Sequence, residues 1–372
     1  MITRKTSVVY IISDIDKSLG FEWAASELKK STVLNFILIG NEGTTFERYL
    51  AAANITYVTI SDSKYPGNLS KFIRVVRVLL RIRPNVVHCH MWRANLIGLT
   101  AAWLVRIPQR IYTRHHAMIH YREFPKGRKW DLLCNQLATK IIAISENVKR
   151  VLTELDGARP SKVTIIHHGF DINYFLNVDE SRPKALKEKY QLNDSSPIIG
   201  VVSRYLELKG IQFTIDAFLE IKEEFPKAHL LLSNAKGYFE TDIKKLLARL
   251  PTGSFTEILF EADLAALYRI MDVHIHVPID SMSEAFGQTY VESLICGVPG
   301  VFTLSGVAPE FIVDGVNALV VPYKNANAIA VAVKRILREP EVKGRLIANG
   351  KQVVNLFSLD KMINALLALY EK

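Results

Sequence analysis

Residues Ser281 to Thr303 read Ser-Met-Ser-Glu-Ala-Phe-Gly-Gln-Thr-Tyr-Val-Glu-Ser-Leu-Ile-Cys-Gly-Val-Pro-Gly-Val-Phe-Thr. Before them, Val273-His-Ile-His-Val277 alternates as a half-buried strand does, and Pro278 ends it. Residues 288–296 have a helical pattern, and Gly297 and Pro299 are residues that commonly follow a helix end. The stretch therefore predicts a strand, a loop, a helix and a second strand over 298–303.

The start of this helix predicts a binding site for an anion. The backbone N–H groups of Gly287, Gln288 and Thr289 have no acceptor within the helix and lie at the positive end of its dipole. Glu284 lies in the loop before them, and Glu292 lies one turn beyond Gln288. A single Glu here is more often a helix cap or a solvated residue. Two of them around one Phe-Gly turn favour a ligand with a diphosphate and hydroxyls on either side.

The residues from Glu284 to Glu292 resemble a motif of a known protein family. Glu284-Ala-Phe-Gly-Gln-Thr-Tyr-Val-Glu292 resembles the Glu-(seven residues)-Glu motif of the family 4 retaining glycosyltransferases, with Ala285 where the family usually has Gly. The resemblance implies an α/β protein of the GT-B fold, with two Rossmann-like parallel-sheet domains facing a central cleft. The expected bounds are 1–178 for the acceptor-side domain, 179–356 for the donor-binding domain, and 357–372 for a C-terminal helix that crosses back to the first domain.

Composition agrees with two globular domains, since the chain has 372 residues of which 49% are hydrophobic. Alternating strands and helices, beginning with strands at 7–13 and 33–39 and a helix at 21–30, predict parallel sheets. Residues 177–196 are polar and are expected to form a linker. Cys89, Cys134 and Cys296 form no disulfide framework and no Cys-x-x-Cys pair, which favours a cytoplasmic protein.

The positive charge is concentrated in one half of the chain. Residues 1–177 carry a net charge of +12 and the remaining residues carry −2. An anionic partner is expected at the first domain, and it is not a nucleic acid, because no RNA-binding or helix-turn-helix motif is present. No apolar run is long enough to span a membrane, so any membrane contact would be peripheral.

Two basic segments could provide that contact. A helix over 68–83 is predicted to place one set of residues in the core and another on a basic face; the first set is Phe72, Val75, Val76, Leu79 and Leu80, and the second is Lys71, Arg74, Arg77 and Arg81. Residues 114–130 mix aromatic and basic side chains. A solvated helix face and contact with anionic lipid are about equally compatible with the pattern of the helix, whereas aromatic and basic side chains together favour an interface at 114–130.

The resemblance assigns further donor-site residues. Ser203-Arg204-Tyr-Leu-Glu-Leu-Lys209-Gly210 is similar to the family's Arg-x-x-x-x-Lys-Gly, which implies that Arg204 and Lys209 hold the diphosphate. Gly20 stands where the family usually has two adjacent glycines near the donor phosphates. The family pattern also implies that Phe286, Gly287, Gln288 and Thr289 contact the donor. Glu284 would bind sugar hydroxyls and Glu292 the ribose hydroxyls.

Histidines follow two strands of the first half. Thr113-Arg-His115 resembles the family's Thr-x-His, whose histidine lies beside the transferred sugar, and His116 is the alternative if the register differs by one. His88 and His90 could bind a metal, but no carboxylate or cysteine completes a familiar ligand spacing. Asp14-Ile-Asp16 closes a strand, where Asp is common in turns. No metal is therefore expected.

The resemblance thus implies a metal-independent retaining glycosyltransferase, with Glu284, His115, Arg204 and Lys209 as its catalytic residues. It needs no cofactor, because the nucleotide-diphosphate sugar is its donor substrate. The expected acceptor is a glycan or lipid-linked glycan of cell-surface polysaccharide or lipopolysaccharide biosynthesis. Two alternatives stay open: a sugar-nucleotide epimerase of the same fold, and an inactive nucleotide-sugar-binding scaffold.

Overall fold

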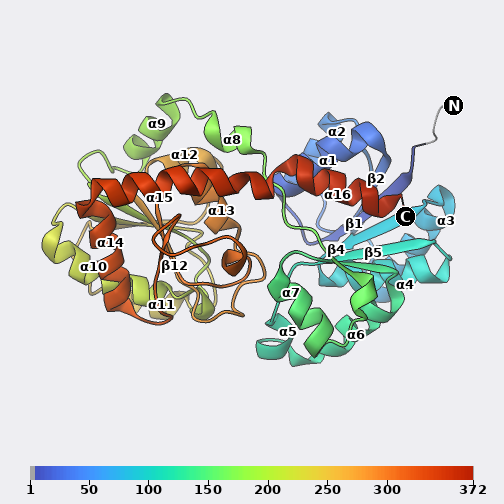
Figure 1. The fold of residues 1–372 in the computed structure, drawn as a ribbon. Helices are drawn as coiled ribbons and strands as arrows, with labels where there is room; N and C mark the ends of the chain where they lie inside the picture. Colours follow the sequence, from blue (N-terminus) through green and yellow to red (C-terminus); the bar gives the residue numbers. More distant parts are fainter. Residues whose placement is uncertain (1–4, 372) are drawn as a thin grey trace. The chain divides into compact units, whose positions relative to one another are not determined.

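A computed structural model describes residues 5–371. The chain forms two compact units: unit 1 contains Met1–Phe170 and Ser358–Lys372, and unit 2 contains Asp171–Phe357. Each unit is built on one parallel sheet with helices packed against it (Figure 1). The predicted α/β class with two Rossmann-like parallel sheets is confirmed.

Unit 1 has a seven-stranded sheet in the order β3-β2-β1-β4-β5-β6-β7. Its strands are β1 (Ser7–Ser13), β2 (Val33–Gly40), β3 (Thr56–Ser61), β4 (Val86–His90), β5 (Gln109–Arg114), β6 (Lys140–Ala143) and β7 (Val163–Ile165). Six consecutive residues of β1 are buried, as expected for the central strand of a sheet that is covered on both faces. The strand order reverses between β1 and β4, and at such a point the carboxyl ends of parallel strands commonly form a site.

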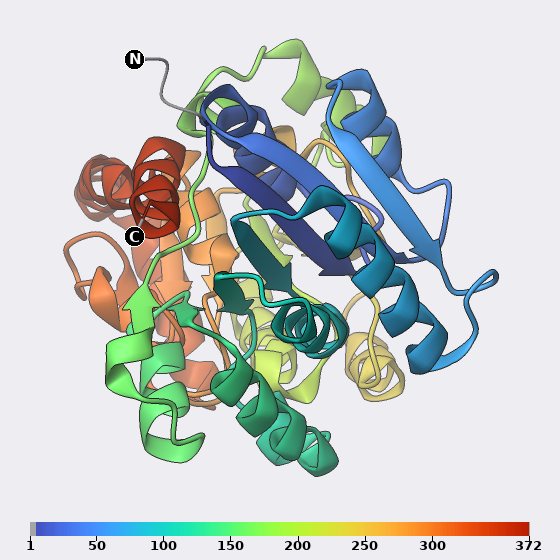
Figure 2. The same ribbon diagram turned by 90° about the vertical axis from the view of Figure 1, so that its right-hand side faces the viewer.

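The helices of unit 1 connect and cover these strands (Figure 2). They are α1 (Leu19–Ser31), α2 (Thr45–Ala52), α3 (Gly67–Ile82), α4 (Trp92–Leu104), α5 (Ile119–Arg122), α6 (Arg128–Leu137), α7 (Glu146–Arg150) and α16 (Leu359–Tyr370), with a π-helical turn at Val151–Leu155. Helices α1 and α2 contact each other, and α3, α4 and α6 pack in series. A capping box between Thr44 and Glu47 begins α2.

Helix α16 completes unit 1, although all of unit 2 precedes it in the chain. It packs against α1 (Figure 1), and the Leu359 N–H donates to the Phe170 carbonyl oxygen at 2.9 Å. The Tyr370 hydroxyl lies 2.6 Å from the Tyr10 hydroxyl and 2.7 Å from His88 Nδ1, all of them buried. These buried polar groups satisfy one another, so they stabilise the docked helix.

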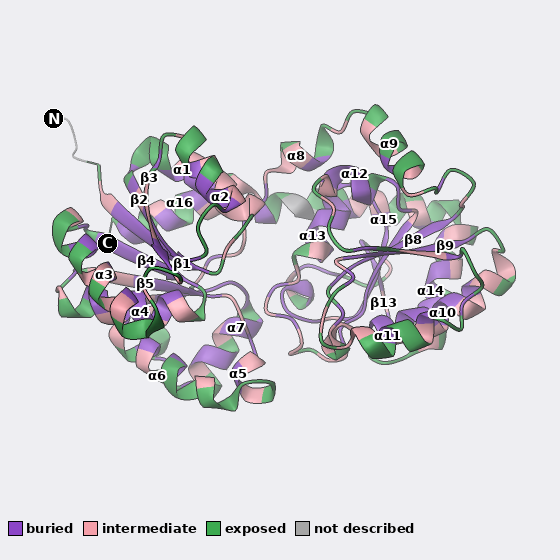
Figure 3. Cartoon of the chain, turned by 180° about the vertical axis from the view of Figure 1, so that it is seen from behind, coloured by how far each residue is buried: buried purple, intermediate pink, exposed green. Residues whose placement is uncertain are grey.

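Unit 2 has a six-stranded sheet in the order β10-β9-β8-β11-β12-β13. Its strands are β8 (Ile198–Val202), β9 (His229–Ser233), β10 (Phe255–Ile258), β11 (Val273–His276), β12 (Gly300–Phe302) and β13 (Leu319–Val320). Its helices are α8 (Ile172–Leu176), α9 (Ser181–Lys189), α10 (Ile211–Glu224), α11 (Glu240–Leu247), α12 (Leu264–Arg269), α13 (Gln288–Ile295), α14 (Ala326–Arg338) and α15 (Pro340–Val353). Both sheets consist largely of buried residues (Figure 3).

The structure moves both predicted domain bounds. Residues 171–178 were expected in the first domain, but α8 packs on α12 and α13 and belongs to unit 2. The expected linker contains α9, which contacts α12 through the ion pair of Arg182 with Asp263. Its polar sequence reflects the exposed side of a short helix. The return to unit 1 begins at Ser358, whose side chain caps α16.

Candidate active site

The Phe-Gly turn of unit 2 has the geometry that the sequence predicts. Gly287 caps α13 with a φ of +86°, and a Cβ there would lie 2.5 Å from the Tyr290 ring, so both its conformation and its surroundings require glycine. Phe286 is buried and its ring lies 5.8 Å from the Phe357 ring. The first backbone N–H groups of α13, at Gln288 and Thr289, therefore start from a firmly anchored turn.

Glu284 is buried immediately before this turn. Its backbone N–H donates to Ser305 Oγ at 3.0 Å, and its carboxylate accepts hydrogen bonds from Lys209 Nζ and from His276 Nε2, the latter at 3.0 Å. Burial on its own raises the pKa of Glu284, but the nearby Lys209 and His276 outweigh burial and lower the pKa to about 2. Glu284 is therefore a fixed carboxylate at neutral pH.

The loop after β8 brings Lys209 to this carboxylate. The Ile279 N–H donates to the Leu208 carbonyl oxygen at 3.1 Å, and a Cβ on Gly210 would lie 1.9 Å from the Val277 carbonyl oxygen. The loop thus packs directly against the segment that follows β11, which only glycine at 210 permits. Arg204 lies at the start of the same loop, where it is exposed and makes no ion pair within residues 5–371.

Glu292 lies on α13 and is also buried. Its Oε2 accepts a hydrogen bond of 2.8 Å from the hydroxyl of the buried Tyr268. Burial raises the pKa of Glu292 to about 7, which the Tyr268 hydrogen bond only partly offsets. The two carboxylates of the motif therefore have opposite pKa shifts. The predicted contact of Glu292 with ribose stays a prediction.

In unit 1, Gly20 and His115 occupy the region after β1 and β5. Gly20 lies in the first turn of α1, and a Cβ there would meet nothing within 4 Å. His115 Nε2 lies 3.1 Å from His90 Nδ1, and the His115 ring stacks 5.5 Å from the His168 ring. Burial and then the neighbouring His90 and His168 lower the pKa of His115 well below its usual value, so it is neutral at pH 7.

His116 points into a different group of side chains. Its ring contacts His120, and its Nε2 lies 3.8 Å from Asp131 Oδ1. No familiar ligand spacing marks this group in the sequence, but α6 brings Asp131 to His116 and His120, and the three side chains could surround a cation. However, Arg114 Nη1 binds the Asp131 carboxylate at 2.8 Å, and a guanidinium there disfavours a metal ion. The group stabilises the loop between β5 and α6.

The two N-terminal aspartates have structural roles, as predicted. Asp14 has a φ of +57° and pairs with Arg93 at 3.0 Å, and Asp16 Oδ1 accepts from the Thr45 N–H at 3.0 Å. Both contacts fix the loop that follows β1 to neighbouring elements. Asp14 thus occupies a left-handed turn position, which Asp tolerates better than most residues.

Helix α3 forms where predicted, but two of its residues lie on unexpected faces. Lys71, expected on the basic face, is buried and pairs with Asp62 at 3.0 Å. Leu80, expected in the core, is 52% exposed. Leu69 and Ile73 are exposed as well, so apolar side chains accompany Arg77 and Arg81 on the outer face. No helix among the described residues is long and apolar enough to cross a membrane.

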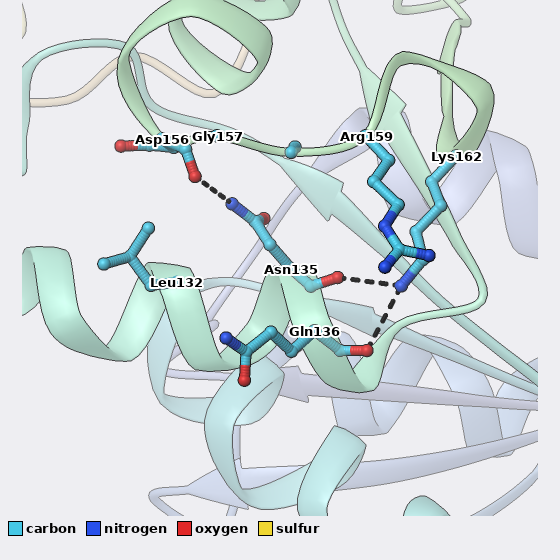
Figure 4. Close-up of a pocket in the computed structure, with 8 residues that line it drawn as sticks. Leu132, Asn135, Gln136, Asp156, Gly157, Arg159 and Lys162 are labelled. Atoms are coloured by element: carbon cyan, nitrogen blue, oxygen red, sulfur yellow. Dashed lines mark hydrogen bonds between the residues drawn. The ribbon is translucent and has the colours of Figure 1, made fainter.

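A cavity of about 390 Å³ lies at the C-terminal end of α6 and contains none of the predicted site residues (Figure 4). It is lined by Leu132, Asn135, Gln136, Asp156, Gly157, Ala158, Arg159 and Lys162. Lys162 Nζ donates to the carbonyl oxygens of Asn135 and Gln136 at 3.1 Å and of Ala138 at 2.7 Å. The ammonium thus neutralises the negative end of the helix.

Sequence reasoning missed the histidine that binds Glu284. The alternation of Val273-His-Ile-His-Val277 predicted a half-buried strand, yet all four residues of β11 are buried. His274 and His276 therefore lie on an inner face, where the sequence alone gives no sign of the carboxylate that His276 meets. The histidine partner of His115, His90, was noted only as a metal-ligand candidate.

Comparison with solved structures identifies the fold as GT-B. HepE of Anabaena, solved with UDP and glucose, has a TM-score of 0.85 and 19% identity, over 98% of this chain and 99% of that one. A glycosyltransferase of Rickettsia africae has a TM-score of 0.81 and 23% identity, over 99% and 98% of the two chains. At sequence identities of 19% and 23%, structural similarity establishes the fold and does not identify the reaction.

Two families match the sequence: Glycosyltransferase Family 4 over residues 37–174 and Glycosyl transferases group 1 over 183–353. The capsular polysaccharide biosynthesis glycosyltransferase CapM of Staphylococcus aureus is 23% identical, over 98% of this chain and 97% of its own. A D-inositol 3-phosphate glycosyltransferase of Kribbella flavida is 25% identical, over 76% and 71%. The chain belongs to the family 4 glycosyltransferases, as its motifs predicted.

Proposed function

We propose that the chain transfers a sugar, with retention of anomeric configuration, from a nucleotide-diphosphate sugar to a glycan or lipid-linked acceptor. The observation that carries this proposal is the contact of Lys209 with Glu284 beside the N-terminus of α13. In a sugar nucleotide the sugar hydroxyls and the phosphates are only a few bonds apart. A carboxylate for hydroxyls and an ammonium for phosphate therefore need to be neighbours, as these two groups are.

The same groups account for catalysis. Departure of the nucleoside diphosphate places negative charge on its β-phosphate, which Lys209, Arg204 and the first amides of α13 would stabilise. Glu284 would orient the sugar, and the neutral His115 is the histidine that the family motif assigns to the transferred sugar. No residue in this assignment acts as a covalent nucleophile and no metal is needed, in keeping with a front-face transfer. HepE, whose structure was solved with UDP and glucose, supports a nucleotide-sugar donor.

We place the reaction in cell-surface polysaccharide synthesis, for which the likeness to CapM is the support. The basic unit 1 would face the acceptor at the cytoplasmic surface of a membrane. Exposed Leu69, Ile73 and Leu80 beside Arg77 and Arg81 on α3 suit peripheral contact with anionic lipid.

A donor panel tests the proposal. The protein is incubated with UDP-, ADP- and GDP-linked sugars, and the melting temperature and the release of nucleoside diphosphate are measured with and without lipid-linked acceptors. Stabilisation by one donor and acceptor-dependent release are expected. Interconversion of the sugar without an acceptor would instead identify an epimerase, and binding without any turnover would identify an inactive scaffold.

A further inference from the structure

His276 shares a single oxygen atom of Glu284 with Lys209. His276 Nε2 lies 3.0 Å from Glu284 Oε1, and Lys209 Nζ contacts the same Oε1. His276 is the last residue of β11 and is 3% exposed, so the central strand of unit 2 fixes its position. A lysine is long and flexible, whereas an imidazole on a strand is a rigid donor to the carboxylate.

The contact also defines the tautomer of His276. Because the Glu284 carboxylate is ionised and only accepts hydrogen bonds, Nε2 must carry the proton and donate it. Burial lowers the pKa of His276, more than the adjacent Glu284 raises it, so the ring is neutral at pH 7. The imidazole orients the carboxylate without adding a second positive charge beside the phosphate-binding groups.

We propose that His276 is a positioning residue for donor recognition, which holds Glu284 in the orientation that binds the hydroxyls of the transferred sugar. The inference rests on the proposed function, because it gives Glu284 the sugar contact. Its distinctive consequence is that His276 affects the sugar part of the donor and leaves the affinity for the nucleoside diphosphate part unchanged.

The competing explanation is that His276 merely fills space in the core. His274 is a matched comparison, since it is two residues earlier on the same strand, is fully buried, and stacks on His276 with ring centroids 6.2 Å apart. Neither ring nitrogen of His274 has a hydrogen-bond partner in the part of the chain that the structure describes. His274 shares the burial of His276 and lacks its contact with a carboxylate.

Calorimetry on the full chain separates the two explanations. Wild type, His276→Leu, His276→Gln and His274→Leu are titrated with UDP-, ADP- and GDP-glucose and with the three free diphosphates. His276→Leu should weaken binding of the preferred nucleotide sugar by about tenfold, the effect of losing one hydrogen bond to a charged group. Binding of the matching diphosphate should change by less than about twofold. His276→Gln, which keeps an N–H donor, should recover part of the loss, and His274→Leu should bind both ligands as wild type does.

A background substitution adds a second readout. In a Glu284→Gln chain, His276→Leu should have little further effect on nucleotide-sugar affinity, because the residue through which it acts is already altered. Equal losses for sugar nucleotide and diphosphate, or unchanged binding of both, overturn the positioning role while leaving the proposed function intact. Wild type that binds none of the six ligands overturns the proposed function itself and the inference with it.

Discussion

Lys209 and Arg204 come from one motif, but the structure gives them different surroundings. Lys209 is the charged partner of the buried Glu284, whereas Arg204 is exposed. Substitution by alanine should impair transition-state stabilisation by about 2–4 kcal/mol at either position, the range for removing a dedicated donor. Steady-state kinetics measures this loss, and turnover within threefold of wild type in both variants would contradict the donor site.

Their effects on stability should differ. Lys209→Ala removes a cation that contacts the buried Glu284 carboxylate and should cost about 3 kcal/mol of unfolding free energy, while Arg204→Ala should cost almost nothing. The lowered pKa of Glu284 makes its stabilising contribution present above about pH 4.5 and lost as the pH falls towards 2. Urea denaturation at pH 7 and pH 4 should therefore show a smaller penalty for Lys209→Ala at the lower pH.

Glu292 should show the opposite pH dependence. Its pKa is raised from 4.5 to about 7, so the folded state prefers the protonated form and loses stability as the pH rises from 4.5 to 7. Glu292→Gln resembles the protonated form and should be more stable than wild type by about 1–3 kcal/mol at pH 8, with little difference at pH 4.5. Thermal unfolding of the two proteins without ligand, at pH 4.5 and at pH 8, measures this difference in stability. A pH-independent difference would show that Glu292 does not titrate as described.

At the scale of elements, strands were more predictable than helix faces. Continuous apolar runs such as β1 and β8 reveal strands covered on both sides, and Gly287 reveals the turn before α13. The orientation of α3 could not be read from its own sequence, because Asp62 before the helix draws Lys71 inward. In the same way, the role of His276 depends on a carboxylate that lies on a separate loop.

The outer face of α3 supports a membrane test. Removing three arginines, each contributing about 1 kcal/mol near an anionic surface, should reduce partitioning by roughly two orders of magnitude. Arg77, Arg81 and Arg83 are the exposed candidates. Flotation with anionic and neutral vesicles at low salt measures how far their joint change to Gln lowers vesicle binding. Exposed Lys29, Lys30 and Arg48 of α1 and α2, changed together to Gln, are the matched control. Wild type that ignores anionic vesicles would exclude this contact.

At the scale of the whole molecule, unit 1 is interrupted by unit 2, yet its two segments meet directly. Phe170 and Ser358 form a bridge, and Leu359 bonds to Phe170. Residues 1–170 joined to 358–372 by a short flexible linker should therefore fold cooperatively. Residues 1–170 alone would expose the surface that α16 covers and should bind hydrophobic dyes and melt without a clear transition. Calorimetry and dye binding compare the joined protein with residues 1–170 alone. The same unfolding transition and dye binding in both proteins would show that α16 contributes little to the stability of unit 1.

The docking of α16 onto β1, β4 and α1 has a consequence for how the protein is made. A ribosome releases the seven strands of unit 1 long before it releases residues 358–372, and it must synthesise the whole of unit 2 in between. During that interval Tyr10 and His88 lack the hydrogen bonds that they later share with the Tyr370 hydroxyl. Unit 2, which is continuous in the chain, can reach its native state first. Until residues 358–372 emerge, the face of unit 1 that α16 covers stays exposed, and exposed apolar surface on an incompletely folded chain favours aggregation.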